Sequence, residues 1–118
     1  MTPGAAPRLS VVVPAANEAR LIPACLAALA GSDPVPGGAE AVVVSNGSAD
    51  GTAAAAEALR PALAAAGWGL TVLDLAQGGK PGALDAGDAA ARGALRAYCD
   101  ADVTVSPRLL PALAGALD

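Results

Sequence analysis

The sequence has no histidine and no phenylalanine among its 118 residues, and Trp68 and Tyr98 are its only aromatic residues. Without histidine, the chain itself offers no Ser-His triad, no histidine general base and no histidine-ligated zinc site. Seven Lys and Arg residues against eleven Asp and Glu residues give a net charge of -4, with no basic run. Because nucleic-acid binders need a basic surface and aromatic stacking platforms, we expect no nucleic-acid partner.

Cysteines and long apolar runs are also scarce. Cys25 and Cys99 are the two cysteines, both lie in apolar segments, and their spacing fits no metal motif, so we expect buried free thiols in preference to a disulfide. Although 54% of the residues are hydrophobic, much of that share is alanine. No stretch of about eighteen residues is free of charge, proline or glycine, so the sequence predicts no transmembrane segment.

The length of the chain fits one domain, or part of a larger one. Residues 1–8 are rich in proline and lack a basic region followed by a long apolar core. We therefore expect a disordered lead-in and not a secretion signal, and a cytoplasmic protein by default. Residues 9–118 are expected to form the folded domain.

Short apolar runs rich in branched residues alternate with segments of helical periodicity. The expected strands are Leu9–Val13, Ala41–Val44, Leu70–Leu75 and Ala94–Cys99. The expected helices are Ala19–Ala30, Ala53–Ala66 and Ala83–Ala91, with a last helix opening at Ser106-Pro107. Pro61 should kink or break the second helix, because proline lacks a backbone donor. This alternation predicts an α/β fold, with an open parallel sheet of about four strands flanked by helices.

Polar clusters follow the carboxyl ends of the expected strands, the edge at which open α/β sheets bind ligands. Asp100 and Asp102 form one such cluster, and in an extended chain both carboxylates would face one side and Ala101 the other. Paired carboxylates suit a hard divalent cation that binds phosphate oxygens, and they also suit a solvated turn or a helix cap. In the cluster after the second strand, Ser48 or Asp50 is expected to cap the next helix.

Four segments at these turns resemble motifs of the GT-A glycosyltransferases of the family-two type. VVVPAANEA, from Val11, is similar to a hydrophobic run followed by Pro-x-Tyr-Asn-Glu, and VVVSNGSADGT, from Val42, to a strand ending in Asp-Asp-Gly-Ser-x-Asp-x-Thr. GGKPGALDAG, from Gly78, matches Gly-Lys-x-x-Ala-Leu-Asn-x-Gly, and YCDADVTVSP, from Tyr98, matches Asp-x-Asp followed by a helix. The resemblance implies the Rossmann-like, nucleotide-binding half of a GT-A fold.

The resemblance also implies a donor site for a UDP- or GDP-sugar with Mn²⁺ or Mg²⁺. Glu18 would bond the nucleoside, Asn46 would face the base, and Asp100 with Asp102 would hold the ribose and the metal ion on the diphosphate. The metal ion would stabilise the charge of the departing nucleoside diphosphate. The implied donor contacts are Pro14, Asn17, Glu18, Asn46, Gly47, Lys80 and Asp100, and the implied metal ligands are Asp100 and Asp102.

Three positions depart from the family pattern. Ala16 stands where the family often has tyrosine, Ser45-Asn46 replaces an acid pair, and Asp85 replaces asparagine. Family members also continue for at least as many residues again, and that half supplies the acceptor site and a general base. We therefore expect a truncated donor domain that binds nucleotide weakly and turns over no acceptor by itself, with inverting transfer in the full-length protein.

Two alternative functions stand beside this one. A retaining GT-A transferase would share the four motifs. A non-catalytic nucleotide-binding or self-assembling fragment would instead pair its open sheet edge with a second chain and form a homo-oligomer. Metal-dependent binding of a nucleotide sugar separates the donor domain from the assembly module.

Overall fold

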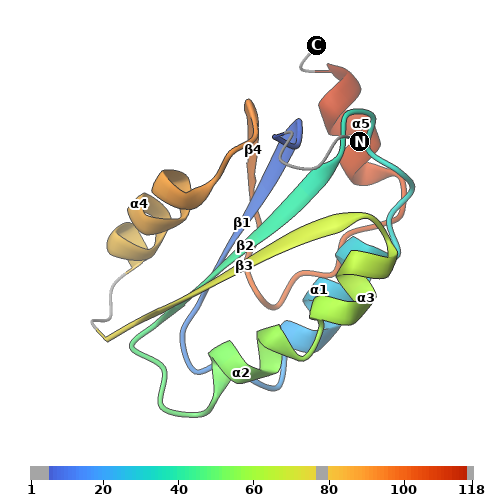
Figure 1. Cartoon of the computed structure of the whole chain (residues 1–118). Helices are drawn as coiled ribbons and strands as arrows, with labels where there is room; N and C mark the ends of the chain where they lie inside the picture. Colours follow the sequence, from blue (N-terminus) through green and yellow to red (C-terminus); the bar gives the residue numbers. More distant parts are fainter. Residues whose placement is uncertain (1–5, 77–79, 117–118) are drawn as a thin grey trace.

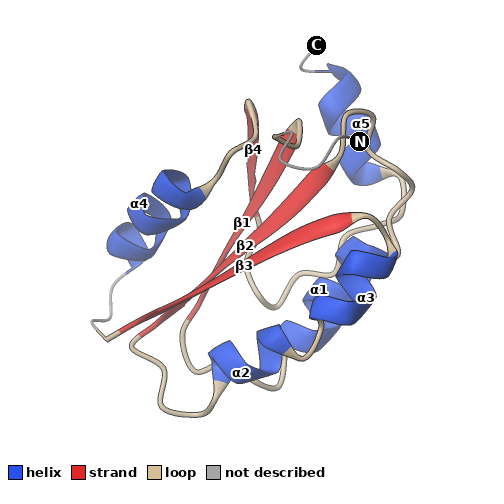
Figure 2. Ribbon diagram, viewed as in Figure 1, coloured by secondary structure: helices blue, strands red, loops and turns tan. Residues whose placement is uncertain are grey.

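The computed structural model describes residues 6–76 and 80–116 of the chain. Its strands are β1 (Leu9–Ala15), β2 (Ala39–Asn46), β3 (Trp68–Leu75) and β4 (Leu95–Tyr98). Its helices are α1 (Ile22–Ala30), α2 (Thr52–Glu57), α3 (Arg60–Ala65), α4 (Lys80–Ala90) and α5 (Leu109–Ala116). Within the described residues the strands form one parallel sheet in the order β3-β2-β1-β4, which confirms the predicted α/β class (Figure 2).

The sheet has helices on both faces, and they cover the two faces unequally. Figure 1 shows α4 alone on one side of the sheet and α1 to α3 on the other. Val11 and Val13 of β1 belong to the larger core, whereas Val12 packs with Val42 and Ala83 under α4. Strands β1 and β2 are buried on both faces, which explains why their sequences are largely continuous apolar runs and do not alternate between apolar and polar residues. Among the residues that the structure describes, no helix is long and apolar enough to span a membrane.

Pro14 does not end β1, contrary to the expectation from the sequence. The strand continues to Ala15, and Pro14 pairs with Val44 of β2. The pairing of β1 with β4 stops at Val12, whose carbonyl oxygen accepts a hydrogen bond from Cys99 N. Pro14 therefore lies beyond the end of β4, where no neighbouring strand needs the N–H that proline lacks.

The predicted break at Pro61 is confirmed, because α2 ends at Glu57 and α3 begins at Arg60 with Pro61 in its first turn. Three other helix starts differ from the expectation by more than one position. Helix α1 begins at Ile22, three positions after Ala19, and α4 begins at Lys80, three positions before Ala83. Helix α5 begins at Leu109, after a turn in which Ser106 O accepts a hydrogen bond from Leu109 N.

A buried polar cluster joins strands and loops at the amino-terminal edge of the sheet, opposite the expected ligand edge. The Glu40 side chain is 2% exposed, and its Oε2 accepts hydrogen bonds from Ser10 Oγ at 2.6 Å and Arg92 N at 2.7 Å. Gly93 N in turn donates to Ser10 Oγ at 2.8 Å. Burial alone would raise the pKa of Glu40, but the hydrogen bonds from Ser10 and Arg92 outweigh it and lower that pKa.

Two residues of the expected lead-in, Pro7 and Arg8, pack against the folded domain. Pro7 is buried, and Arg8 N donates to the carbonyl oxygens of Gly37 and Gly38 at 3.2 Å each. Residues 1–5 of the expected lead-in lie outside the described residues.

Candidate functional site

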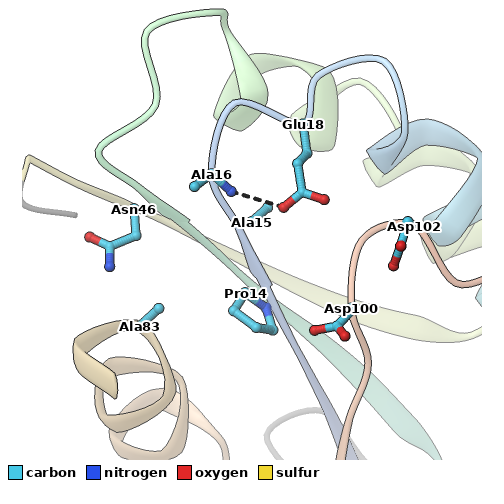
Figure 3. Close-up of a pocket in the computed structure, with 8 residues that line it drawn as sticks. All are labelled: Pro14, Ala15, Ala16, Glu18, Asn46, Ala83, Asp100 and Asp102. Carbon is cyan, nitrogen blue, oxygen red and sulfur yellow. Dashed lines mark hydrogen bonds between the residues drawn. The ribbon is translucent and has the colours of Figure 1, made fainter. Parts of the chain in front are cut away.

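A pocket of about 270 Å³ lies at the carboxyl edge of the sheet. Figure 3 shows the carboxyl groups of Glu18, Asp100 and Asp102 on one side of Pro14 and the Asn46 amide on the other, beside α4. These side chains come from the ends of different strands, as the parallel topology predicts. The residues that line the pocket are Pro14, Ala15, Ala16, Glu18, Asn46, Ala83, Asp100 and Asp102. Five of the predicted site residues thus meet in one place.

Asp100 and Asp102 lie in a turn and not in the strand itself, because β4 ends at Tyr98. Asp100 O closes this turn by accepting a hydrogen bond from Val103 N at 3.0 Å. Ala101 is 1% exposed and packs in the larger core, while the two aspartates are exposed. The burial of Ala101 holds the turn in place and leaves both carboxylates facing the pocket. The two carboxylates therefore lie on one side and Ala101 on the other, as predicted, although this segment is a turn and not a strand.

Glu18 is held by the turn that follows β1. Its Oε1 accepts a hydrogen bond from Ala16 N at 3.1 Å, and its backbone N donates to Thr52 Oγ1 at 3.0 Å. The first contact folds the side chain back over its own turn and leaves Oε2 facing the pocket (Figure 3). Glu18 is therefore a positioned acceptor at this edge.

Asn17 joins two loops and does not line the pocket. Its backbone has a φ of 53°, a left-handed conformation that asparagine tolerates better than most residues. Its Oδ1 accepts a hydrogen bond from Ala49 N at 2.8 Å, and its N donates to Ser48 Oγ at 3.1 Å. Asn17 thus fixes the loop after β1 against the loop after β2.

Asp50 strengthens the same junction. Its Oδ2 accepts a hydrogen bond from Ala19 N at 3.1 Å, and its Oδ1 accepts from both N and Oγ1 of Thr52. The bonds from Thr52, and then the one from Ala19, lower the pKa of Asp50. Neither Ser48 nor Asp50 is the cap residue of α2, which is Gly51 with a φ of 82°. Sequence reasoning missed this junction because its partners lie 31 to 34 positions apart, beyond any local pattern.

Only one residue of the Ser45-Asn46 pair reaches the pocket. Asn46 is 5% exposed and lies on the face of β2 that α4 covers. Ser45 points to the opposite face, as side-chain alternation requires, and within residues 6–76 and 80–116 its buried hydroxyl has no hydrogen-bond partner. Gly47 has a φ of 70° and donates its N–H to Leu75 O at 2.8 Å, so it turns the chain beside the pocket.

Two further residues with an expected role, Lys80 and Asp85, lie within α4. Lys80 is the first residue of α4, but its side chain and residues 77–79 lie outside what the structure describes. Asp85 is exposed on α4 and is not among the residues that line the pocket. Its negative charge therefore does not point at a ligand in this pocket.

The donor atoms of the pocket fit a hard cation that brings other ligands with it. Asp100 and Asp102 offer carboxylate oxygens, which Mg²⁺ and Mn²⁺ prefer. Among the described residues, no group of three or more His, Cys, Asp or Glu side chains is arranged to bind a metal ion. Mg²⁺ usually takes one or two carboxylates together with waters and substrate phosphates, and this donor set matches that pattern.

The two cysteines lie directly behind the acid pair. Cys25 of α1 is 1% exposed, Cys99 is half-buried just before Asp100, and both are free thiols as predicted. A hydrogen bond with Cys99, together with burial, raises the pKa of the Cys25 thiol far above its ordinary value.

Comparison with known proteins finds one family and several solved structures. The model of glycosyl transferase family 2 matches residues 10–118. S. aureus TarS is 28% identical with a TM-score of 0.81 over 94% of this chain and 19% of its own. TarS 1-349 in complex with UDP-GlcNAc is 27% identical with a TM-score of 0.82 over 94% of this chain and 31% of its own.

A third structure is the mannosyltransferase PcManGT from Pyrobaculum calidifontis in complex with GDP-Man and Mn²⁺. It is 32% identical with a TM-score of 0.78 over 98% of this chain and 34% of its own. The chain thus spans between 19% and 34% of the length of these proteins. No protein of curated function matches it.

Proposed function

The chain belongs to glycosyl transferase family 2, and from that premise we propose that it is the donor domain of a glycosyltransferase that binds a nucleotide-diphosphate sugar with a divalent cation. One observation supports this most directly. Three carboxyl groups and one amide, from the ends of three strands, line a single pocket at the carboxyl edge of a parallel sheet. The related TarS and PcManGT structures, which contain UDP-GlcNAc and GDP-Man, favour a UDP- or GDP-sugar as the partner.

Each pocket residue has a role in this proposal. Asp100 and Asp102 would bind Mn²⁺ or Mg²⁺, which when bound stabilises negative charge on the diphosphate. Asp100 would also contact the ribose, and Glu18 would accept a hydrogen bond from the nucleoside through the Oε2 that Ala16 N does not engage. Asn46 would face the base with an amide that both donates and accepts.

The remaining predicted residues act at the margin of the pocket. Pro14 forms its floor between the acidic side and the amide. Asn17 and Gly47 fix the two loops that border it. Lys80 would contact phosphate from the start of α4.

The size of the pocket fits part of a nucleotide sugar. Pockets that bury most of a drug-sized ligand span about 300–1,000 Å³, and this one is about 270 Å³. We infer that the sugar and the acceptor are contacted by the remainder of a longer protein, where transfer is inverting. An inverting transfer needs a general base for the acceptor hydroxyl, and we assign that role to no residue of this chain.

Calorimetric titration of UDP and GDP, each with and without Mn²⁺, tests the proposal. We expect binding that depends on Mn²⁺, that chelation by EDTA reverses, and that Asp102→Asn weakens at least about tenfold, because a hard cation loses an anionic ligand. Asp33→Asn is the matched control, since Asp33 is an exposed aspartate outside the pocket. Equal binding by wild type and Asp102→Asn, or binding that ignores Mn²⁺, would contradict the proposal.

A second candidate role is self-association, favoured by an apolar patch beside the edge strand β4. Tyr98, Val103, Leu109 and Leu113 are 39% to 55% exposed and line an apolar pocket of about 210 Å³. An exposed sheet edge with an apolar border is a surface for pairing with a second copy. Light scattering at rising concentration tests this role: we expect a dimer that Val103→Glu dissociates, and a monomer throughout would exclude it.

A further inference from the structure

Two thiols from distant parts of the sequence meet at one backbone atom of the candidate metal site. Cys25 Sγ lies 3.9 Å from Asp100 O, and Cys99 Sγ lies 3.5 Å from the same oxygen. Cys25 is on α1 and Cys99 follows β4, so this contact joins a helix to the turn that presents the acid pair.

The two sulfur atoms differ in how a reagent can reach them. Cys99 lines the apolar pocket of about 210 Å³ beside β4, together with Val103 and Leu113. Cys25 is 1% exposed and does not line that pocket. A small oxidant that enters the pocket therefore meets Cys99 first and finds Cys25 behind it.

We propose that Cys25 and Cys99 form a reversible disulfide on reaction with a low-molecular-weight disulfide, and that this bond displaces Asp100. In the first step the Cys99 sulfur attacks the small disulfide, forms a mixed disulfide and releases one small thiol. In the second step the Cys25 sulfur attacks the Cys99 sulfur and releases the second small thiol. The two cysteine hydrogens leave on the two small thiols, and the small disulfide is reduced by two electrons.

The expected effect on the site follows from the chain geometry. A disulfide has an S–S length of about 2.05 Å, so closing it draws Cys99 toward α1. Both S–H groups that point at Asp100 O are lost at the same time. Because Ala101 is fixed in the core at 1% exposure, the displacement falls on Asp100 and on the turn that its carbonyl closes with Val103 N. The disulfide itself does not depend on the proposed function; its effect on ligand binding does.

The bond is tested by incubating the chain with mixtures of reduced and oxidised glutathione and trapping free thiols by alkylation. Mass spectrometry of wild type should show a Cys25–Cys99 cross-linked peptide and two fewer alkylated thiols. Cys25→Ala should stop at a mixed disulfide on Cys99, because the second thiol is missing. Wild type that keeps both thiols alkylatable, or that stops at the same mixed disulfide as Cys25→Ala, would overturn the proposal.

The effect on the turn is measured without any ligand, by amide hydrogen exchange of Val103 in the reduced and the oxidised chain. We expect exchange at least about tenfold faster in the oxidised chain, and no difference in the Cys25→Ala/Cys99→Ala variant under the same conditions. Unchanged protection of Val103 in a chain shown to contain the disulfide would overturn the displacement of Asp100.

Binding of Mn²⁺ with UDP or GDP is a separate readout. Changes to the groups that orient metal ligands typically weaken metal affinity about 10- to 100-fold, and we expect at least a tenfold loss of binding in the oxidised chain. If the reduced chain binds neither nucleotide, the proposed function fails, while the cross-link and exchange measurements still decide the thiol pair.

Discussion

Glu40 gives the sharpest test of how the fold is held together. Its buried carboxylate accepts hydrogen bonds from Ser10 Oγ and Arg92 N, and a third from Arg92 Nε at 3.3 Å. The Arg92 side chain is 54% exposed, so its ion pair contributes at most about 1 kcal/mol. The buried bond from Ser10 and the partly buried bond from Arg92 N go to a charged acceptor and contribute about 1.5–3 kcal/mol each.

Glu40→Ala should therefore lower the free energy of unfolding by about 3–5 kcal/mol, because it leaves the buried Ser10 hydroxyl and the partly buried Arg92 N–H without their acceptor. Glu40→Gln keeps the shape and one acceptor oxygen, so a loss of about 1–2 kcal/mol is expected. Urea unfolding followed by the fluorescence of Trp68, the single tryptophan and 7% exposed, measures both. Glu57→Gln is the control: Glu57 pairs with Arg60 at the surface, where solvent screens the pair, so this substitution should leave the free energy of unfolding nearly unchanged.

The pH dependence provides an independent check. The folded-state pKa of Glu40 is lowered, so its stabilisation is fully present above the unfolded value of about 4.3 and is lost as pH falls through the folded pKa. The stability gap between wild type and Glu40→Gln should be constant near neutral pH and shrink below about pH 4. A Glu40→Ala variant within 0.5 kcal/mol of wild type, or a gap that does not change with pH, would refute the reasoning.

Two further predictions concern the elements that border the pocket. A Cβ on Gly87 of α4 would overlap Val12 Cγ1, so Gly87→Ala should lower the free energy of unfolding in urea by about 1–3 kcal/mol. Gly82→Ala is the control on the same helix: a Cβ there would have no atom within 4 Å, so the substitution should be neutral or stabilising. Equal effects of the two substitutions would count against this packing. Asp50→Asn should speed amide hydrogen exchange at Ala19, whose N–H donates to the Asp50 carboxylate. In wild type, the NMR shift of the Ala19 amide should titrate with a midpoint below the ordinary aspartate pKa of about 3.9, because hydrogen bonds lower the pKa of Asp50 and are lost as pH falls through it. A midpoint at the ordinary value would contradict the hydrogen bond.

The α/β class, the parallel sheet and the pocket at its carboxyl edge could be predicted from the sequence. Apolar runs such as Val11–Val13 alternate with helical periodicity, and parallel strands joined by right-handed crossovers must bring their carboxyl ends to one edge. That rule alone predicted that Glu18, Asn46 and Asp100 would meet, and they do. The break at Pro61 followed from the chemistry of one residue.

Other features needed the tertiary structure. Pro14 is tolerated within β1 because the pairing of β1 with β4 stops at Val12, two residues before it. Several contacts join residues that are 30 to 83 positions apart. They are the hydrogen bonds of Asn17 and Asp50 across two loops, the Glu40 cluster, and the contact of Cys25 with Asp100. Local periodicity determines which segments are strands and helices, but strand order and register determine which distant side chains become neighbours, and so only the folded chain decided these contacts.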